Sequence, residues 1–327
     1  MKREMLSRHA DINLLWNLDK VGQCSLDDGM SEDLRKAVFA NLDSREEEMA
    51  LENERLMQQH QEQRETYHFC YRQPFLDGDA RVIVADWLLQ KAHAWESTPR
   101  SFSTALIIFD RLALDLSFLV PPSQMQLLAV VSLSISMKIY DSPSLGTLDL
   151  YEGTVCAYSL EQITEMEIKA LTRIGWKIDF VSHFQWVDCM ARAGVWGELW
   201  RAPECVRKDV LNVANFAIDL HLEEESTLKE RGKVVACASV VIGMVGNELG
   251  MWNRVLGRIS KVEKQKAVKV AESMAEMWKN ATHAVKDKRR FLLIKHKEVI
   301  ESYCPDAILR QLKSVDIVDA WPNSAIA

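Results

Sequence analysis

Glycine and proline are scarce in this chain, with 13 and 8 residues in 327. Runs that alternate polar and apolar side chains are also few. Because both residues interrupt helices and alternation is typical of strands, the sequence predicts an all-α protein. No apolar run approaches the roughly 18 residues of a membrane-spanning helix, and the first residues lead into no apolar signal segment. We therefore expect an intracellular protein without a membrane partner.

Paired cysteines and catalytic motifs are missing as well. The seven cysteines form no Cys-x-x-Cys pair, and no histidine stands at zinc-ligand spacing, so we expect reduced thiols and no metal site. No glycine-rich phosphate loop, His-Glu-x-x-His, Gly-x-Ser-x-Gly or kinase signature occurs, so we expect neither an enzyme nor a cofactor. His221 precedes Glu223, Glu224 and Glu225, a pattern that favours a solvated helix end over a cluster of metal ligands.

The charge is uneven along the chain. The net charge is −7, yet residues 1–75 carry 10 basic and 15 acidic side chains, whereas residues 250–300 carry 13 basic and 5 acidic ones. This distribution argues against a uniform nucleic-acid-binding surface, and we expect no nucleic acid as partner. Residues 286–290 are strongly basic and could serve nuclear import or meet an acidic partner, but a solvated helix face is favoured.

Helical periodicity organises the sequence into two similar halves. A polar helix is expected over residues 44–67, packed along one side of a domain. Between residues 80 and 174, capping residues and apolar spacing predict five helices, of which the stretch 127–137 is apolar or small all round and belongs at the centre of a bundle. A similar stretch, 234–245, follows about a hundred residues later, which suggests a second copy of the five-helix unit.

The expected domains follow from this repeat. Residues 1–75 form an N-terminal region with a packing helix, 76–182 the first unit, 183–285 the second, and 286–327 a terminal helix and tail.

Four charged residues stand in otherwise apolar helical stretches: Arg81, Asp110, Lys138 and Glu167. A charge on an apolar face is costly unless it is paired. Each of these residues therefore needs a partner, inside the fold or on another protein.

The motifs around these charges resemble the cyclin family over residues 80–178. They are Arg81-Val-Ile-Val-Ala-Asp86-Trp87-Leu88, Phe109-Asp110-Arg111, Gln126-Leu127, Ser136-Met-Lys138, Tyr158-Ser159 and Met166-Glu167. In this order and spacing they are similar to the opening helix and later segments of a cell-cycle cyclin box. The resemblance implies two tandem five-helix cyclin-box domains with an N-terminal helix.

The resemblance also implies a function and residue roles. The chain is expected to be a non-catalytic regulatory subunit that binds and activates a cyclin-dependent protein kinase in cell-cycle control, in the nucleus and cytoplasm. Arg81 and Asp110 resemble a structural ion pair, and Lys138 and Glu167 the kinase-facing pair. The apolar part of the kinase interface would comprise Ile139, Leu171, Trp176 and Ile178.

Two alternatives stay open for this interface. Lys138 and Glu167 could form a simple salt bridge that joins two helices, and Leu171 and Ile178 could belong to the core. The sequence Ile139-Tyr140-Asp141 replaces the family's Glu-Glu, which bears on the choice of kinase.

A second surface resembles the groove that receives Arg-x-Leu substrates or inhibitors in some cyclins. Its residues would be Ala80, Ile83, Val84, Trp87, Met125 and Gln126. Ala80 replaces the usual Met and Val84 the usual Leu, so the pocket is shallower or unused, and the stripe would otherwise be core.

The main alternative function is a cyclin-box adaptor in transcription initiation. It predicts a basic face across both repeats and a zinc ribbon near the N-terminus. The acidic N-terminal region, the missing metal ligands and the motif Asp86-Trp87-Leu88 disfavour it, and a salt-dependent gel-shift with DNA would decide. A helical scaffold without a kinase would keep Arg81 and Asp110 but gives no reason for Lys138 and Glu167.

Overall fold

The computed structural model describes residues 32–66, 78–115, 117–142, 144–190, 204–224, 229–250, 252, 254–283 and 290–314. These residues form helices and, within the described ranges, no strand. The prediction of an all-α protein is therefore confirmed.

The first repeat is a five-helix unit. Its helices are α4 (Gly78–Ala94), α5 (Pro99–Leu114), α6 (Met125–Tyr140), α7 (Thr147–Gly153) and α8 (Leu160–Arg173), with the short 3-10 turn η2 (Pro122–Gln124) before α6. Local sequence fixes several of the ends. The Thr98 side chain accepts a hydrogen bond from the Ser101 amide at the start of α5, and Ser159 and Gln162 form a capping box at α8.

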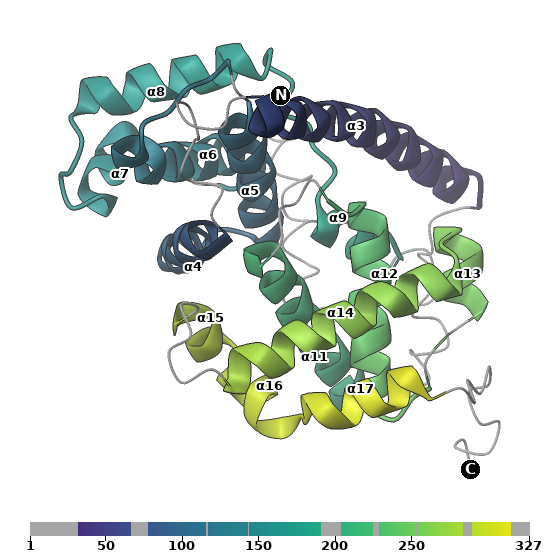
Figure 1. The fold of residues 1–327 in the computed structure, drawn as a ribbon. Coiled ribbons are helices and arrows are strands. Elements are labelled where there is room, and N and C mark those ends of the chain that lie inside the picture. Colours follow the sequence, from purple (N-terminus) through teal and green to yellow (C-terminus); the bar gives the residue numbers. More distant parts are fainter. Residues whose placement is uncertain are drawn as a thin grey trace.

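The second repeat has a matching set of described helices. They are α9 (His183–Met190), α11 (Glu204–Glu224), α12 (Gly232–Gly246), α13 (Arg254–Ser260) and α14 (Lys264–His283). Three further helices complete the described chain: α15 (Arg290–Lys295), α16 (Lys297–Ser302) and α17 (Pro305–Lys313). The expected tandem arrangement is confirmed (Figure 1).

The central helices α6 and α12 are buried on nearly all sides, as their uniformly apolar or small composition predicted. In α6, the residues that are not buried are Gln126, Lys138 and Ile139. The last two lie in the last turn of the helix, so the C-terminal end of α6 presents a cation and an apolar side chain toward the surface.

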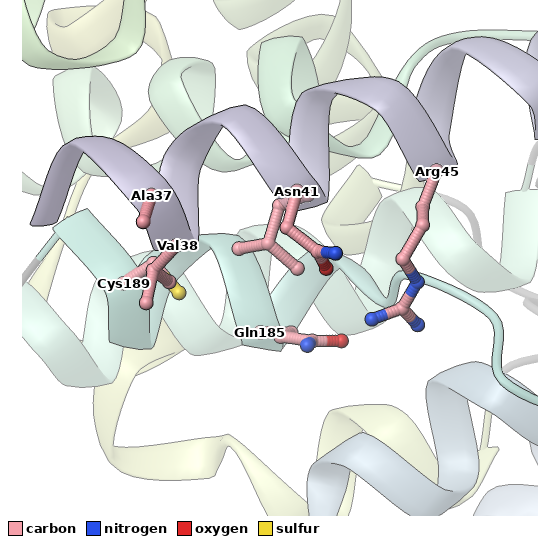
Figure 2. A pocket seen from close by; sticks show the side chains of 7 residues that line it. Ala37, Val38, Asn41, Arg45, Gln185 and Cys189 are labelled. Carbon is pink, nitrogen blue, oxygen red and sulfur yellow. The ribbon is translucent and has the colours of Figure 1, made fainter. Parts of the chain in front are cut away.

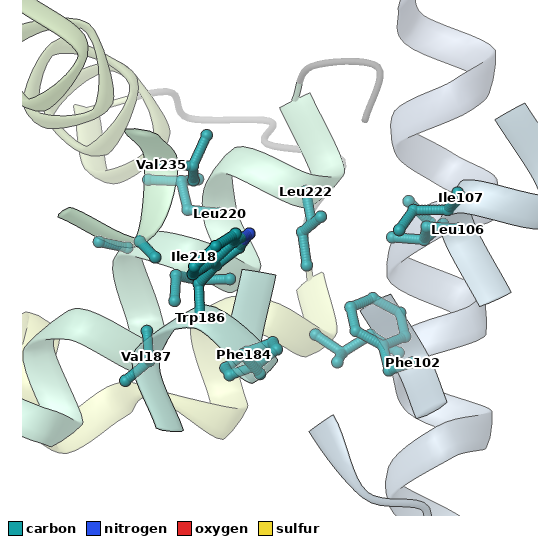
Figure 3. Close-up of a cluster of buried hydrophobic side chains, with 14 of the residues drawn as sticks. Phe102, Leu106, Ile107, Phe184, Trp186, Val187, Ile218, Leu220, Leu222 and Val235 are labelled. Atoms are coloured by element: carbon teal, nitrogen blue, oxygen red, sulfur yellow. The ribbon is translucent and has the colours of Figure 1, made fainter. Parts of the chain in front are cut away.

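Both repeats share one hydrophobic core. Figure 3 shows Phe102, Leu106 and Ile107 on α5 opposite Phe184 and Leu222 of the second repeat. Removing these side chains from water favours the docked arrangement by about 25 cal/mol per Å² of apolar surface. The junction therefore holds the two repeats in a fixed relation, which positions the surfaces on both of them.

The N-terminal helix α3 (Glu32–Thr66) is longer than predicted and begins 12 residues before the expected start at residue 44. The earlier part packs because Phe39 and Leu42 are buried in the core. Helix α3 lies beside α9, and a groove of about 320 Å³ between them is lined by Val38, Arg45, Gln185 and neighbouring residues (Figure 2).

Polar contacts tie α3 to both repeats. Arg45 Nη2 donates to the Asp179 carbonyl (2.7 Å) at the end of the first repeat. Glu46 Oε1 accepts from Trp186 Nε1 (3.0 Å) and from the Lys233 amide (2.9 Å) at the start of α12. Burial raises the pKa of Glu46, and these donors oppose that rise. Helix α3 therefore bridges the repeats and caps the central helix of the second.

Candidate partner-binding face

The predicted kinase-facing charges lie at the surface where α6 and α8 pack together. Lys138 is in the last turn of α6, where the helix dipole favours a cation. Its Nζ donates to Glu167 Oε1 on α8, and the two side chains are 37% and 16% exposed. The two residues therefore satisfy each other in the chain alone, as the salt-bridge alternative states, while their edge stays open to solvent. Their role toward a kinase stays a prediction.

The predicted apolar residues surround this pair at different depths. Ile139, Leu171 and Ile178 are partly buried and pack against the core. Trp176 is 64% exposed. After α8 the chain passes through two residues with left-handed backbone conformation, Gly175 (φ 62°) and Trp176 (φ 59°). This turn places the Trp176 indole outside the core. Ile168 on α8 is exposed too, although its position carries no motif that would predict a role at this face.

The corresponding face of the second repeat is covered. There α12 and α14 occupy the places of α6 and α8, and α17 packs against both of them. Counted from the first residue of each helix, Gly246 of α12 corresponds to Ile139 of α6, and Gly246 lies against Tyr303 and Ile308. In the second repeat α17 thus packs on this face. On the equivalent α6/α8 face of the first repeat, Trp176 and Ile168 are exposed.

Arg81 and Asp110 form a buried bidentate ion pair. Arg81 Nε donates to Asp110 Oδ1 (2.8 Å) and Nη2 donates to Oδ2 (2.9 Å). The third donor, Nη1, reaches the backbone carbonyl of Glu223 on α11 (2.7 Å). The guanidinium therefore joins α4 to α5, as the resemblance implied, and also joins the first repeat to the second.

Asp86, from the same opening motif, also links the repeats. Its carboxylate accepts hydrogen bonds from the backbone amides of Phe291 (2.9 Å) and Leu292 (2.9 Å) at the start of α15. A carboxylate at this end satisfies amides that have no partner within the helix. The Asp-Trp-Leu motif thus anchors a segment about 200 residues further along the chain.

The residues of the expected peptide groove do not share one surface. Met125 is 1% exposed and belongs to the core, because it begins the central helix. This corrects its assignment to a peptide groove. Ala80, Val84, Trp87 and Gln126 are partly buried, and Ile83 is 52% exposed. A role in docking Arg-x-Leu peptides stays a prediction for these five.

The expectation of a solvated helix end at residues 221–225 is wrong for His221 and Glu223. Both are buried, because the end of α11 packs against α4 at the junction of the repeats. Burial, with the nearby charge of Arg81 as the next cause, lowers the pKa of His221 to about 4. Burial also lowers the pKa of His183 to about 3, with His221 as the next cause. Both imidazoles are therefore neutral at physiological pH.

Within the described ranges, no group of three or more His, Cys, Asp or Glu side chains could hold a metal ion. Among the helices described, none is both long and apolar enough to cross a membrane. The N-terminal residues, where the adaptor alternative expects a zinc ribbon, and the basic residues 286–289 lie outside the described part of the chain.

Comparison with known sequences gives two adjacent family matches. The pattern described as "Cyclin, N-terminal domain" matches residues 47–179, and that described as "Cyclin, C-terminal domain" matches residues 182–298. Together they cover most of the chain. The domain boundaries given above stay predictions.

Individual relatives are distant. The chain is 24% identical to G2/mitotic-specific cyclin-B1 of Xenopus laevis over 246 residues, which are 74% of this chain and 57% of the relative. It is 27% identical to cyclin-D5-2 of Oryza sativa subsp. japonica over 116 residues, which are 34% of this chain and 31% of the relative. The chain thus spans less than two thirds of each of these relatives.

A solved structure shares the fold. The viral cyclin from herpesvirus saimiri superposes with a TM-score of 0.53 at 14% identity, covering 62% of this chain and 85% of the viral chain. At this identity the likeness extends to the fold alone.

Proposed function

The chain belongs to the cyclin family, and from this membership we propose that it is a regulatory subunit that binds and activates a cyclin-dependent serine/threonine protein kinase in cell-cycle control. The single observation that carries the proposal is the exposure of large apolar side chains on the α6/α8 face, within the part of the chain that the structure describes. The second repeat fills the equivalent position with its own α17, whereas the first exposes Trp176 and Ile168 beside Lys138 and Glu167. An apolar face around a paired cation and carboxylate suits a helical protein partner.

Activation would follow from selective binding. The active conformation is a minor state of the free kinase. A rigid helical face that fits only this conformation makes it the most populated state. A shift from 1:99 to 99:1 requires about 5.5 kcal/mol of differential affinity. The shared core, the bridging α3 and the Arg81 contacts favour such rigidity, because they limit deformation of the first repeat.

The charged pair would also contribute to selectivity. In the unbound chain Lys138, in the last turn of α6, and Glu167, in the middle of α8, hold each other in place. On binding, the ammonium would donate to main-chain carbonyls of the kinase and the carboxylate would accept from its amides. Side chains that are already ordered lose less conformational entropy on association.

The proposal is tested by measuring the affinity of purified cyclin-dependent kinases for Lys138→Ala and Glu167→Ala. Each change should weaken binding by roughly 2 to 5 kcal/mol while the fold persists, because it removes one partner of a desolvated interface contact. The matched control is the Glu165→Ala, Lys169→Ala double variant. That ion pair lies on the same helix α8, is exposed and spans 3.3 Å, so its loss should leave affinity unchanged.

The simple salt-bridge alternative gives a different result. Removal of a partly exposed pair would cost about 1 kcal/mol of stability or less and leave kinase affinity at the wild-type value. Kinase binding that survives both single changes would therefore refute the assignment of this face.

We also propose that the protein acts in both nucleus and cytoplasm. Imaging of a fluorescent fusion in dividing cells tests this, and confinement to any other compartment would contradict it.

A further inference from the structure

A groove of about 450 Å³ lies between α14 and α17, on the second repeat. It is lined by Lys264, Gln265, Val268, Lys269, Glu272, Leu312, Lys313 and Ser314. Val268 and Leu312 are its buried apolar members. Three ammonium groups face one carboxylate among the lining residues, so the groove as a whole is positive.

The neighbouring charges leave this sign unchanged. Lys313 Nζ donates to Glu276 Oε1 on α14 (2.9 Å), and both side chains are about half exposed. The exposed Lys266, next to the groove on α14, and the exposed Glu263, directly before Lys264, offset each other, so the lysines remain in excess. Lysine stems also cover apolar surface while their ammonium groups stay in water. The groove therefore suits a short peptide that carries both carboxylates and apolar side chains.

The direction of α17 indicates which peptide lies nearest. Asp306, near the start of α17, pairs with Lys279 near the end of α14 (2.7 Å). The end of α17 borders residues 264–272, at the beginning of α14. The two helices are therefore antiparallel, as Figure 1 shows, and Ser314 leaves α17 at the lip of the groove.

The residues after Ser314 have the matching composition. Residues 315–321 read Val-Asp-Ile-Val-Asp-Ala-Trp, and no Lys or Arg occurs in residues 315–327. Seven extended residues span up to about 23 Å. The eight residue steps from Glu272 back to Lys264 along a helix correspond to roughly 12 Å. The segment is therefore long enough to line the groove.

We propose that residues 315–321 of this chain occupy the groove between α14 and α17. The carboxylates of Asp316 and Asp319 would lie against Lys264 and Lys269, and the apolar side chains would cover Val268 and Leu312. The second repeat would then carry a peptide-binding surface that its own chain fills. The proposal does not depend on kinase binding, because the groove lies on the other repeat from the α6/α8 face.

Disulfide trapping in the full chain tests the position of the segment. The background would carry serine at the exposed cysteines Cys156, Cys205 and Cys304, and at Cys24 and Cys70, which lie outside the described residues. One variant combines Gln265→Cys with Asp316→Cys, and its control combines Lys266→Cys with Asp316→Cys. Residues 265 and 266 are adjacent on α14, but only Gln265 lines the groove. Cysteine Cα atoms must lie within about 7 Å to bridge.

After oxidation with diamide and peptide mapping by mass spectrometry, we expect at least tenfold more bridge for the 265–316 pair than for the 266–316 pair. Adding Lys269→Glu should lower the 265–316 yield several-fold, because it reverses a charge in the groove. Equal yields from the two cysteine pairs would overturn the proposal and leave the groove to a peptide of another protein. A yield unchanged by Lys269→Glu would overturn the electrostatic pairing.

Discussion

Arg81 shows how a single side chain can hold two repeats together. Its guanidinium is buried, and its donors reach a carboxylate in the first repeat and a backbone carbonyl in the second. Such a group depends on all of its partners, because an unpaired buried charge is far more costly than an unpaired neutral group.

Asp110→Ala should lower the free energy of unfolding by roughly 3 to 5 kcal/mol, because it leaves the Arg81 guanidinium buried without its carboxylate. Urea denaturation followed by circular dichroism measures this loss. The control is Glu165→Ala, which removes the partner of Lys169 from an ion pair whose two side chains are both more than half exposed. That change should cost about 1 kcal/mol or less. Similar losses for the two variants would contradict the burial of the Arg81 pair.

Sequence reasoning identified Asp110 as the partner of Arg81 but did not find Glu223. The ion pair follows from two motifs in apolar stretches, each of which needs a countercharge. The contact with Glu223 uses a backbone carbonyl 142 residues away, and a carbonyl carries no side-chain signal. The run of three glutamates instead suggested solvent, because composition alone does not show that the end of α11 is covered by α4.

At the scale of elements, the central helix α12 packs closely against α11. A Cβ at Gly243 would lie 2.5 Å from the Val210 carbonyl oxygen. Glycine is therefore required here to let the two backbones approach, although it disfavours a helix by about 1 kcal/mol relative to alanine.

Gly243→Ala should lower the free energy of unfolding by about 1 to 3 kcal/mol, because the clash with the Val210 backbone outweighs the gain in helix propensity. The shift of the urea midpoint measures this effect. Gly146→Ala is the control, since its Cβ would make only an ordinary contact, 3.4 Å from Asp149 Oδ2. A Gly243→Ala variant as stable as the wild type would contradict the close approach of the α12 backbone to the Val210 carbonyl.

Most elements were predictable because their signals are local. Capping residues and apolar spacing gave the helices of the first repeat, and the all-apolar stretches gave both central helices. The early start of α3 was missed although residues 37–40 read Ala-Val-Phe-Ala, because this apolar stretch is too short to predict what Phe39 and Leu42 pack against. Their packing depends on the second repeat, which a local pattern does not contain. The Met125 assignment failed similarly, since a sequence match does not distinguish the two faces of a central helix.

For the whole molecule, the junction between the repeats combines the shared core with a group of buried polar side chains. His183 Nδ1 lies 3.1 Å from Ser103 Oγ of the first repeat, and the His183 and His221 rings are 6.3 Å apart. Arg81 and Asp110 lie close enough to influence these imidazoles. Protonation of either ring would therefore place a new charge inside the interface between the repeats.

Acid should weaken the whole molecule through this junction. The folded pKa values of about 3 for His183 and about 4 for His221 lie below the ordinary 6.5. Below pH 6.5 the unfolded chain binds protons that the folded chain does not, so stability is full above that pH and falls as the pH decreases toward 4. The two residues together should remove about 2.5 kcal/mol between pH 7 and pH 5.5. Urea titrations at both pH values measure the drop.

The variant His183→Asn tests the contribution of one ring, because its amide can still contact Ser103. It should lose about half of the pH dependence. A drop as large as that of the wild type would rule out His183 as a cause.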